Sequence, residues 1–527
     1  MIRAMKAVPA IFVAAGIAYL VLTVPHLDRY PPVGEDEPWI AAAPVKLATQ
    51  GVLGNDLFTG YYSMERHHLQ HMPVYPLLEA GVFRLLGVGV WQMRTLSVAF
   101  GLALLAVVFV VGAQTGDPRV GVVAVLILLL LKTTTGENGS GILLLDRARV
   151  NRYDIAVPVF GLMALWAFNR ARASARGLMF FMAGLFAGLS TLSHLYGIFW
   201  MVVVLAMLGV APRERRVRSA LVITAGFVLT CSPWAIFVVR YWADYVGQMK
   251  SAGARFELFD PAFYLRNTLT ADGPISAAWA IRSIRELPLV RIGTWTMLFG
   301  LALSGAIAAA AAWRRRMSMS AAALMVAAVI QLLLFTSLLT VKTMAYMTAL
   351  WPIGSLVLAW GLVRVWSRSP VWIRAAVVGV LSAALVEGAA GIMAARTSAR
   401  RVSPYDFYTA QIARCIPSGA RVLGFQHYWM GLRQFEYRTW LLPLGMARPE
   451  WYKEDLTLHQ ALERVDPDVV LIDRFMANYL RDVEAPGHPY HSNGADVKSF
   501  MDEHGAVLAC SIADRTYGAM LVYMVSK

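Results

Sequence analysis

Three consecutive carboxylates, Glu35, Asp36 and Glu37, stand early in the chain, directly before Pro38 and Trp39. Neighbouring carboxylates repel one another, which raises the proton affinity of at least one of them. A carboxylate of this kind can act as a general base or help to hold a divalent metal. The alternative is a solvated acidic loop that caps a helix starting near Pro38. Both interpretations place a helix directly after the motif.

A second cluster lies at the mouth of a later apolar run and combines arginines with an aspartate. Its members are Arg147, Arg149, Arg152 and Asp154. Basic residues on the outer side of a membrane run against the positive-inside rule, and they make sense if they meet an anionic ligand. The alternative is a loop of ion pairs in which the arginines bind Asp146 and Asp154.

A third cluster, residues 65–73, is rich in histidine. His67 and His71 are four residues apart, so on a helix their imidazoles would share one face. That spacing suits a metal, but the sequence identifies no third ligand. Solvated or phosphate-binding histidines are the alternative that we favour.

The elements that must position these clusters are membrane spans. Hydrophobic residues make up 58% of the 527 residues and charged residues only 15%, too little charge for a water-soluble surface. A spanning helix needs roughly 20 mostly apolar residues, and about eleven runs qualify, some of them only if they extend into neighbouring residues. They are 8–24, 95–113, 120–131, 155–168, 178–192, 198–210, 220–239, 292–313, 321–339, 347–363 and 375–394.

The arginines of the short loops define an orientation. They occur as small clusters between apolar runs, which is typical of cytoplasmic loops, so the net charge of +15 does not indicate nucleic acid. The clusters are Arg170, Arg172 and Arg176; Arg213, Arg215, Arg216 and Arg218; Arg314, Arg315 and Arg316; and Arg364 and Arg368. They fall on the same side as the N-terminus. We therefore expect a multi-pass protein of a bacterial inner (plasma) membrane, with a cytoplasmic N-terminus and a periplasmic or extracellular C-terminal domain.

The predicted external segments hold all three polar clusters. They comprise residues 25–94, 132–154, 240–291 and everything after 395. Within the first of them, 39–47 and 74–86 have helical periodicity but are too short to span, so we expect interfacial helices. The predicted domains are a transmembrane domain, 1–395, and a soluble domain, 396–527.

The soluble domain reads as a small α/β fold from Ser403 onward. A helix is expected from Ser403 to Cys415, and strands at 421–425, 468–472, 506–511 and 519–525. Cys415 and Cys510 could pair in an oxidising compartment, or remain two unpaired thiols.

The order of these motifs resembles that of a known family. An acidic motif follows the first span, and a Pro-Val-Tyr segment ending at Tyr75 leads into an apolar helix. Later come Gln92-Met93-Arg94, Arg152-Tyr153-Asp154, a segment around His194, and Lys342-Thr343-Met344-Ala345-Tyr346. Over residues 8–365 the chain resembles the C-type glycosyltransferases of the protein O-mannosyltransferase and aminoarabinose transferase superfamily, which use a polyprenyl-phosphate sugar on the non-cytoplasmic face.

The resemblance implies roles for particular residues. Asp36 matches the catalytic aspartate, Glu37 its usual neighbour and Asp154 the second acidic position. The expected donor-phosphate ligands are Arg94, His71, Arg152 and Arg149, and the expected substrate contacts are Tyr75, His194 and Tyr346. Two positions depart from the family: His71-Met72-Pro73 stands where Lys-Pro-Pro is common, and His194 where lysine is common.

The resulting hypothesis is an inverting glycosyltransferase with an aspartate as general base. Its partners would be a polyprenyl-phosphate sugar, membrane lipid, and a lipid, protein or polysaccharide acceptor, without nucleic acid. No cofactor is implied with certainty, a divalent metal is possible, and no metal ligands are assigned. The alternatives are a multi-pass transporter, whose polar residues usually lie at the bilayer midplane, and a non-catalytic membrane scaffold.

Overall fold

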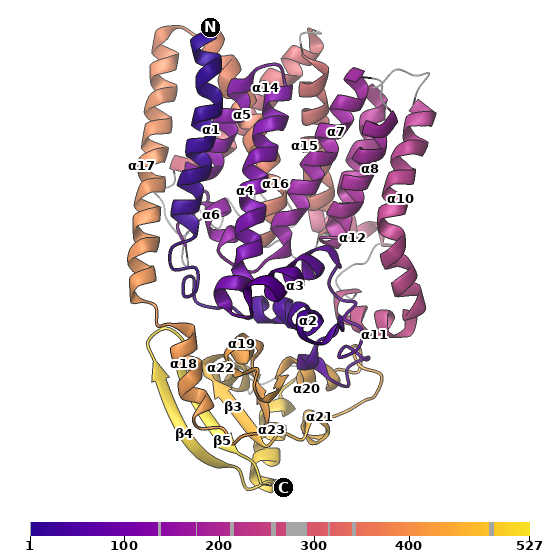
Figure 1. Ribbon diagram of the computed structural model, residues 1–527, viewed down its shortest axis with the longest axis vertical. Helices are drawn as coiled ribbons and strands as arrows, with labels where there is room; N and C mark the ends of the chain where they lie inside the picture. The colour runs from indigo at the N-terminus through magenta and orange to yellow at the C-terminus, as the bar shows by residue number, and fades with distance from the viewer. Residues whose placement is uncertain are drawn as a thin grey trace.

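The computed structural model consists of a helical bundle and a smaller C-terminal domain at one end of it (Figure 1). It describes residues 2–134, 139–174, 177–210, 216–253, 260–269, 292–314, 317–339, 344–483 and 490–526. Arg176, Arg213, Arg215, Arg315, Arg316, Lys342 and Thr343 lie outside these ranges, as does much of the segment 240–291. The N-terminus lies at the end of the bundle away from the C-terminal domain, and we call the opposite end the domain side.

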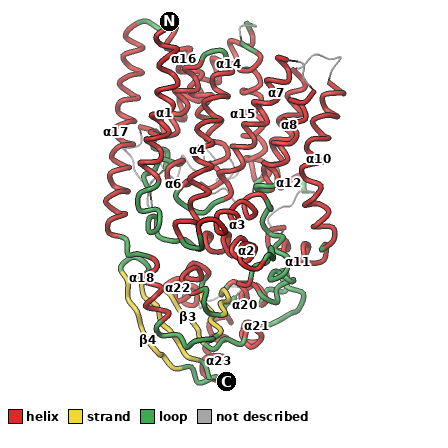
Figure 2. Tube along the Cα trace, in the orientation of Figure 1, coloured by secondary structure: helices red, strands yellow, loops and turns green. Residues whose placement is uncertain are grey.

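Each of the eleven predicted spans contains a helix, and most of these helices run side by side along the long axis of the bundle (Figure 2). They are α1 (Ile2–Thr23), α4 (Val90–Gln114), α5 (Pro118–Leu130), α7 (Ala156–Ser174), α8 (Gly177–Thr191), α9 (Phe199–Ala206), α10 (Arg216–Arg240), α14 (Ile292–Trp313), α15 (Met319–Leu338), α16 (Met344–Arg368) and α17 (Val371–Arg401). By length and composition, six described helices could cross a membrane: α4, α10 and α14 to α17. The chain is a multi-pass membrane protein, and the count of eleven spans stays a prediction.

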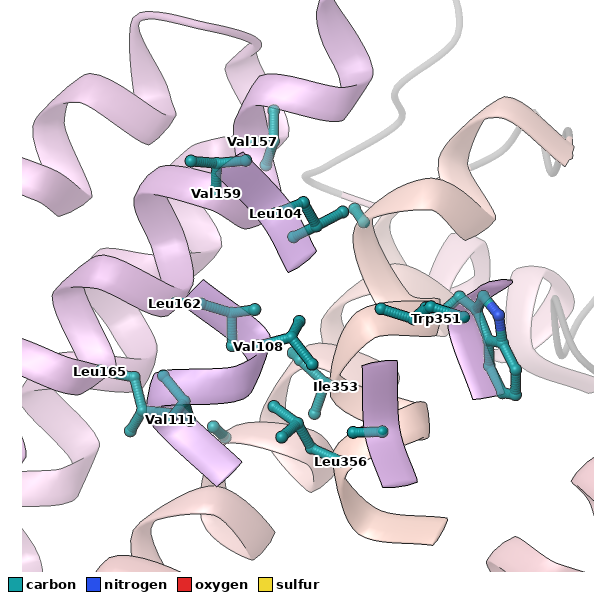
Figure 3. Packing of buried hydrophobic residues seen from close by; sticks show 14 of the residues in the cluster. Leu104, Val108, Val111, Val157, Val159, Leu162, Leu165, Trp351, Ile353 and Leu356 are labelled. Atoms are coloured by element: carbon teal, nitrogen blue, oxygen red, sulfur yellow. The ribbon is translucent and has the colours of Figure 1, made fainter. Parts of the chain in front are cut away.

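The core of the bundle is formed by helices that lead to the second polar cluster. Leu104 and Val108 of α4 face Leu162 of α7, and Ile353 and Leu356 of α16 fill the space beside them (Figure 3). Burial of such side chains stabilises the bundle where helix meets helix. Because the start of α7 is anchored in this core, the polar residues just before it are held in place.

Two helices lie across the domain side of the bundle, between it and the C-terminal domain (Figure 1). They are α2 (Asp36–Gln50) and α3 (Val74–Leu86), which confirms the two short amphipathic segments of the first long loop. Asp36 and Glu37 occupy the first turn of α2, where carboxylates favour the positive end of the helix dipole. Three shorter helices are α6 (Leu143–Ala148), α11 (Trp242–Gly253) and α12 (Pro261–Leu269).

The C-terminal domain is a five-stranded mixed sheet with the order β2-β1-β3-β5-β4. Its strands are β1 (Arg421–Gly424), β2 (Glu436–Thr439), β3 (Val469–Asp473), β4 (Val507–Asp514) and β5 (Gly518–Met524). Strand β1 is parallel to β2 and β3, whereas β5 is antiparallel to β3 and β4. The domain's helices are α18 (Tyr405–Ala413), α19 (Trp429–Leu432), α20 (Leu441–Met446), α21 (Leu458–Val465), α22 (Arg474–Val483) and α23 (Ser492–Glu503).

Four of these strands match the sequence prediction, and β2 was not predicted. It is a four-residue edge strand with two charged residues, Glu436 and Arg438, so it lacks the apolar character of a strand. A disulfide joins Cys415 to Cys510, which resolves the two alternatives for these thiols. Helix α17 continues to Arg401, past the predicted boundary at residue 395, and the polar C-terminal fold starts only after it.

Candidate active site

Asp36 lies where α2 starts, at the junction of the bundle and the surface helices. Its carboxylate is partly open to solvent, with 46% of the side chain exposed, and its Oδ2 accepts a hydrogen bond from Nη1 of Arg152. Among the described residues, none donates a hydrogen bond to Oδ1 of Asp36. One carboxylate oxygen is therefore held in place while the other remains available.

Asp154 is bound to the same guanidinium from the opposite direction. Nε of Arg152 donates to Oδ2 of Asp154 at 2.8 Å, and the Tyr196 hydroxyl donates to Oδ1 at 2.7 Å. Asp154 is fully buried. Burial alone would raise the pKa of this carboxyl, but Arg152, His194 and Tyr196 together lower it, so the group stays ionised. Arg152 thus connects a buried carboxylate to a partly open one and brings the two aspartates to one site.

Glu37 points away from Asp36 into a buried network. Its carboxylate accepts hydrogen bonds from Nε and Nη2 of Arg94 at 2.7 and 2.6 Å, and from the backbone N–H groups of Asn151 and Gly34. The remaining Arg94 contact is to the carbonyl of Leu27, and the arginine is fully buried. The structure thus places Glu37 and Arg94 in a buried ion pair with each other, and their predicted roles in catalysis and in phosphate binding stay predictions.

Asn151 holds the second polar cluster against the surface helices, and the sequence analysis missed it. Its side chain donates to Glu79 of α3 at 2.8 Å and accepts from the Tyr75 hydroxyl at 2.7 Å. Tyr75 also bonds Ser97 of α4 and is fully buried. Tyr75 therefore lies in a buried hydrogen-bond network, and its contact with substrate stays a prediction. A single asparagine between charged residues carries no sequence signal that could have revealed this contact.

His71 lies beside the site and forms a hydrogen-bonded pair with His68. Its Nδ1 lies 3.0 Å from Nε2 of His68, and its ring packs against Trp39 and Tyr153. Burial lowers the pKa of His68 to about 4, and burial together with nearby His68, His194 and Arg152 lowers that of His71 well below its usual value. Both rings are therefore neutral near pH 7. If Nε2 of His68 donates the shared proton, His71 carries its own proton on Nε2 and can donate it to a ligand.

An aromatic wall connects His194 to the two carboxylates. The ring of His194 lies against Tyr153 and Tyr196, with ring centroids 5.1 and 3.9 Å apart, and Tyr346 stands 6.0 Å away. Burial lowers the pKa of His194 to about 4, so this ring is also neutral. His194 and Tyr346 remain candidates for contact with substrate.

The two other arginines of the second cluster separate. Arg149 turns away from Asp36 and donates to the carbonyls of Leu22, Pro25 and Tyr30, so the structure does not bring it to the predicted phosphate site. Arg147 is half-buried, and its charge interacts with those of Arg152, Asp154 and Asp36. Within the described part of the chain, no residue accepts a hydrogen bond from Arg147. The charges of both carboxylates therefore act on Arg147, whereas Arg149 is engaged elsewhere.

The side chains do not form an evident metal site. Within the described ranges, no group of three or more histidine, cysteine, aspartate or glutamate side chains is arranged to hold a metal ion. Arg152 occupies the space between Asp36 and Asp154 where a bridging cation would bind. The possible divalent metal therefore finds no support from these residues.

The C-terminal domain packs against the acidic motif. The pKa of Glu35 is raised, first by partial burial and then by Asp36, and the charges of His427 and Asp473 from the domain also act on it. One apolar core joins Val33 and Ala42 of the first loop to Tyr405 and Tyr428 of the domain. The hydroxyls of Tyr61 and Tyr62 both donate to the carbonyl of Trp451. Asp36 thus lies at a three-way junction of bundle, surface helices and domain.

Comparisons with known proteins agree with this arrangement. Residues 70–237 match the family model described as dolichyl-phosphate-mannose-protein mannosyltransferase. Among solved structures, ArnT from Cupriavidus metallidurans bound to undecaprenyl phosphate has a TM-score of 0.60 at 14% identity, covering 98% of this chain and 97% of that chain. Archaeal oligosaccharyltransferase AglB from Archaeoglobus fulgidus, in complex with an inhibitory peptide and a dolichol-phosphate, has a TM-score of 0.57 at 12% identity. It covers 98% of this chain and 74% of that chain. Among curated protein sequences, none matches this chain.

The chain is a multi-pass membrane protein with the fold of the solved C-type glycosyltransferases. Residues 70–237, from the histidine loop to near the end of α10, are similar to the family of the dolichyl-phosphate-mannose-protein mannosyltransferases. That segment contains Arg152 and Asp154, whereas Asp36 precedes it.

Proposed function

We propose that the protein transfers a sugar from a polyprenyl-phosphate donor to an acceptor hydroxyl on the extracytoplasmic face, with Asp36 as general base. The observation that carries this proposal is the bridge from Asp154 through Arg152 to Asp36. It fixes one oxygen of a partly open carboxylate and leaves the other available. A sugar phosphate already has a stable leaving group, so the chemistry needs a base for the acceptor more than an acid for the donor.

The proposed step is a single displacement at the anomeric carbon. The acceptor hydroxyl gives its proton to the free oxygen of Asp36 as its own oxygen forms a bond to that carbon. The bond from the anomeric carbon to the phosphate oxygen breaks, and its electron pair remains on the phosphate. Attack opposite to the leaving group inverts the anomeric configuration. In this account Asp154 is a positioning residue, because it touches Arg152 and Tyr196 and lies fully buried.

The leaving phosphate gains one negative charge in this step, and nearby donors must stabilise it. Arg147 has a guanidinium that no described residue uses, and His71 has a neutral ring near Arg152. A guanidinium offers paired, planar donors to a phosphate. We therefore assign the donor phosphate to Arg147 and the neutral His71, with Arg152 as the second cation. The lipid-linked ligands of the two solved relatives, undecaprenyl phosphate and dolichol-phosphate, are of the same chemical kind as this proposed donor.

The proposed orientation places the site outside the cytoplasm. The Cys415–Cys510 disulfide supports it, because disulfides persist in oxidising compartments, and the arginine loops support it through the positive-inside rule. A reporter that is active only in the cytoplasm, fused after Lys527, should be silent. Clear activity of that reporter would reverse the orientation.

The decisive test is donor cleavage by the purified protein. Reconstituted vesicles receive a panel of radiolabelled polyprenyl-phosphate sugars and acceptor membranes from source cells that lack the gene. The wild-type protein should release polyprenyl phosphate and move label into a new product. A transporter would move intact donor across the vesicle membrane without cleaving it, and a scaffold would do neither, so either result rejects the proposal.

A further inference from the structure

A cavity with charged and apolar lining lies at the edge of the bundle, and Asp36 does not line it. It has a volume of about 270 Å³ and is lined by the domain-side ends of α1 and α17 together with α6 and the loop after α1. Its charged lining comprises Arg149, Arg396, Arg400 and Asp146, with His26 at its edge. The proposed reaction uses none of these residues.

The shape of the cavity follows from the packing of α17. Gly388 and Gly391 bring this helix into close contact with the backbone of Leu130 and Ser140, where a Cβ atom would come within 2.1 and 2.0 Å of the carbonyl oxygens. Beyond that contact, Ile392, Ala395 and Ala399 line the space between α17 and α1. Helix α17 is thus held against the end of α5 and the segment at Ser140, and the cavity lies between α17 and α1 next to this contact.

The cavity carries uncompensated positive charge. The carboxylate of Asp146 accepts hydrogen bonds from Ser140 and from the backbone N–H of Gly141. The guanidinium of Arg149 donates to backbone carbonyls, which carry no net charge. In the parts of the chain that the structure describes, no carboxylate lies within ion-pair distance of Arg396 or Arg400. Burial, together with the charges of Arg94 and Arg396, lowers the pKa of Arg149, which an anion in the cavity would offset.

Apolar side chains continue from the cavity along the same two helices. Ile17 and Val21 of α1 are 58% and 54% exposed, and Val386 and Met393 of α17 are 70% and 69% exposed. In a membrane protein such a surface faces acyl chains, and arginines at the end of a span lie at headgroup depth. The charge and the apolar strip together match one amphipathic ligand, an anionic lipid.

We propose that this cavity, between the domain-side ends of α1 and α17, binds the phosphodiester headgroup of an anionic phospholipid whose acyl chains lie along both helices. This lipid is separate from the sugar donor. Because α17 leads directly into α18 of the C-terminal domain, the bound lipid would brace the helix that positions the domain.

The test is lipid retention by the full-length protein. Protein is reconstituted in nanodiscs of phosphatidylcholine with phosphatidylglycerol, released into detergent, and examined by native mass spectrometry. Wild type should retain a phosphatidylglycerol molecule. The double variant Arg396→Gln/Arg400→Gln should reduce the affinity for it by roughly thirtyfold, since each arginine near an anionic surface contributes about a factor of five. Arg401→Gln is the matched control, because Arg401 is exposed on the same helix but does not line the cavity.

Three outcomes would overturn the proposal. Equal retention by wild type and double variant would show that the cavity does not bind the lipid. Displacement of the lipid by millimolar inorganic phosphate would make the cavity a site for free anions. Retention of polyprenyl phosphate in preference to phosphatidylglycerol would assign a different lipid. Donor cleavage is measured separately on the same preparations, so failure of the lipid site and failure of the proposed reaction can be told apart.

Discussion

Asp36 and Asp154 accept hydrogen bonds from the two ends of one guanidinium group, that of Arg152. One carboxylate is buried and fully bonded, whereas the other is partly open. The proposed roles follow from this difference. Asp154 holds Arg152 in position, and Arg152 in turn holds one oxygen of Asp36. The other oxygen of Asp36 is the one that we propose to face the acceptor.

Arg147 should determine the affinity for the donor. The variant Arg147→Gln removes a charge-assisted contact to the phosphate, and hydrogen bonds to charged groups contribute about 1.5–3 kcal/mol, so donor affinity should fall at least tenfold. The measurement is equilibrium binding of a polyprenyl-phosphate sugar to the purified protein. Arg149→Gln is the matched control for donor affinity, because Arg149 faces away from the carboxylates. Similar losses in both variants would contradict the assignment.

Arg94 should act on stability and leave donor affinity largely intact. In Arg94→Gln the buried carboxylate of Glu37 loses its charged partner, and breaking a buried ion pair costs about 3–5 kcal/mol. The midpoint of thermal unfolding should therefore fall clearly, while the exposed control Arg84→Gln should leave it unchanged. If Arg94→Gln folds with wild-type stability but fails to bind the donor, the phosphate role expected from the sequence would be restored.

Glu79 should make stability depend on pH. Burial, opposed by the hydrogen bond from Asn151, raises the pKa of this carboxyl well above its usual 4.5. The folded protein therefore keeps a proton that the unfolded chain releases, so the stabilisation is present below pH 4.5 and is lost as the pH rises toward the folded-state pKa. Glutamine in the variant Glu79→Gln has the shape of the protonated carboxyl and does not titrate, so its stability does not decrease in this way as the pH rises.

Thermal unfolding across a pH series checks this expectation. Glu79→Gln should unfold at a higher temperature than wild type near about pH 8 and at a similar temperature in mild acid. The exposed Glu463→Gln should follow wild type throughout. A constant difference between Glu79→Gln and wild type at every pH would mean that Glu79 does not hold a proton in the folded state.

The sequence predicted the elements of this fold better than the partners within the site. Spans and surface helices follow from the length and period of apolar runs, and Asp36 and Asp154 follow from their placement beside those runs. The distribution of the arginines could not be predicted in the same way. Arg94, Arg147, Arg149 and Arg152 are chemically identical, and only the packing of the chain decides which of them meets Glu37, a backbone carbonyl or Asp36.

The edge strand β2 and the contact of the C-terminal domain with the acidic motif escaped prediction for a related reason. Tyr437 and Thr439 are buried by tertiary contacts and not by a periodic apolar pattern. The charges of His427 and Asp473, which contact each other in the C-terminal domain, act on the pKa of Glu35, although the domain is remote from Glu35 in sequence. Long-range pairing of this kind leaves no local signal in a single sequence.

The central claim, that Asp36 is the general base, is tested most directly by separating turnover from donor binding in Asp36→Asn. The substitution keeps the shape of the side chain and removes its basicity, so turnover should fall by about a hundredfold or more, while the dissociation constant of the polyprenyl-phosphate donor stays near that of wild type. Glu35→Gln, the neighbouring carboxylate, is the matched control and should retain most of the turnover. An acceptor that is itself a phosphate would need no base, so the assay uses an acceptor with a free hydroxyl. Wild-type turnover in Asp36→Asn with such an acceptor would contradict the account.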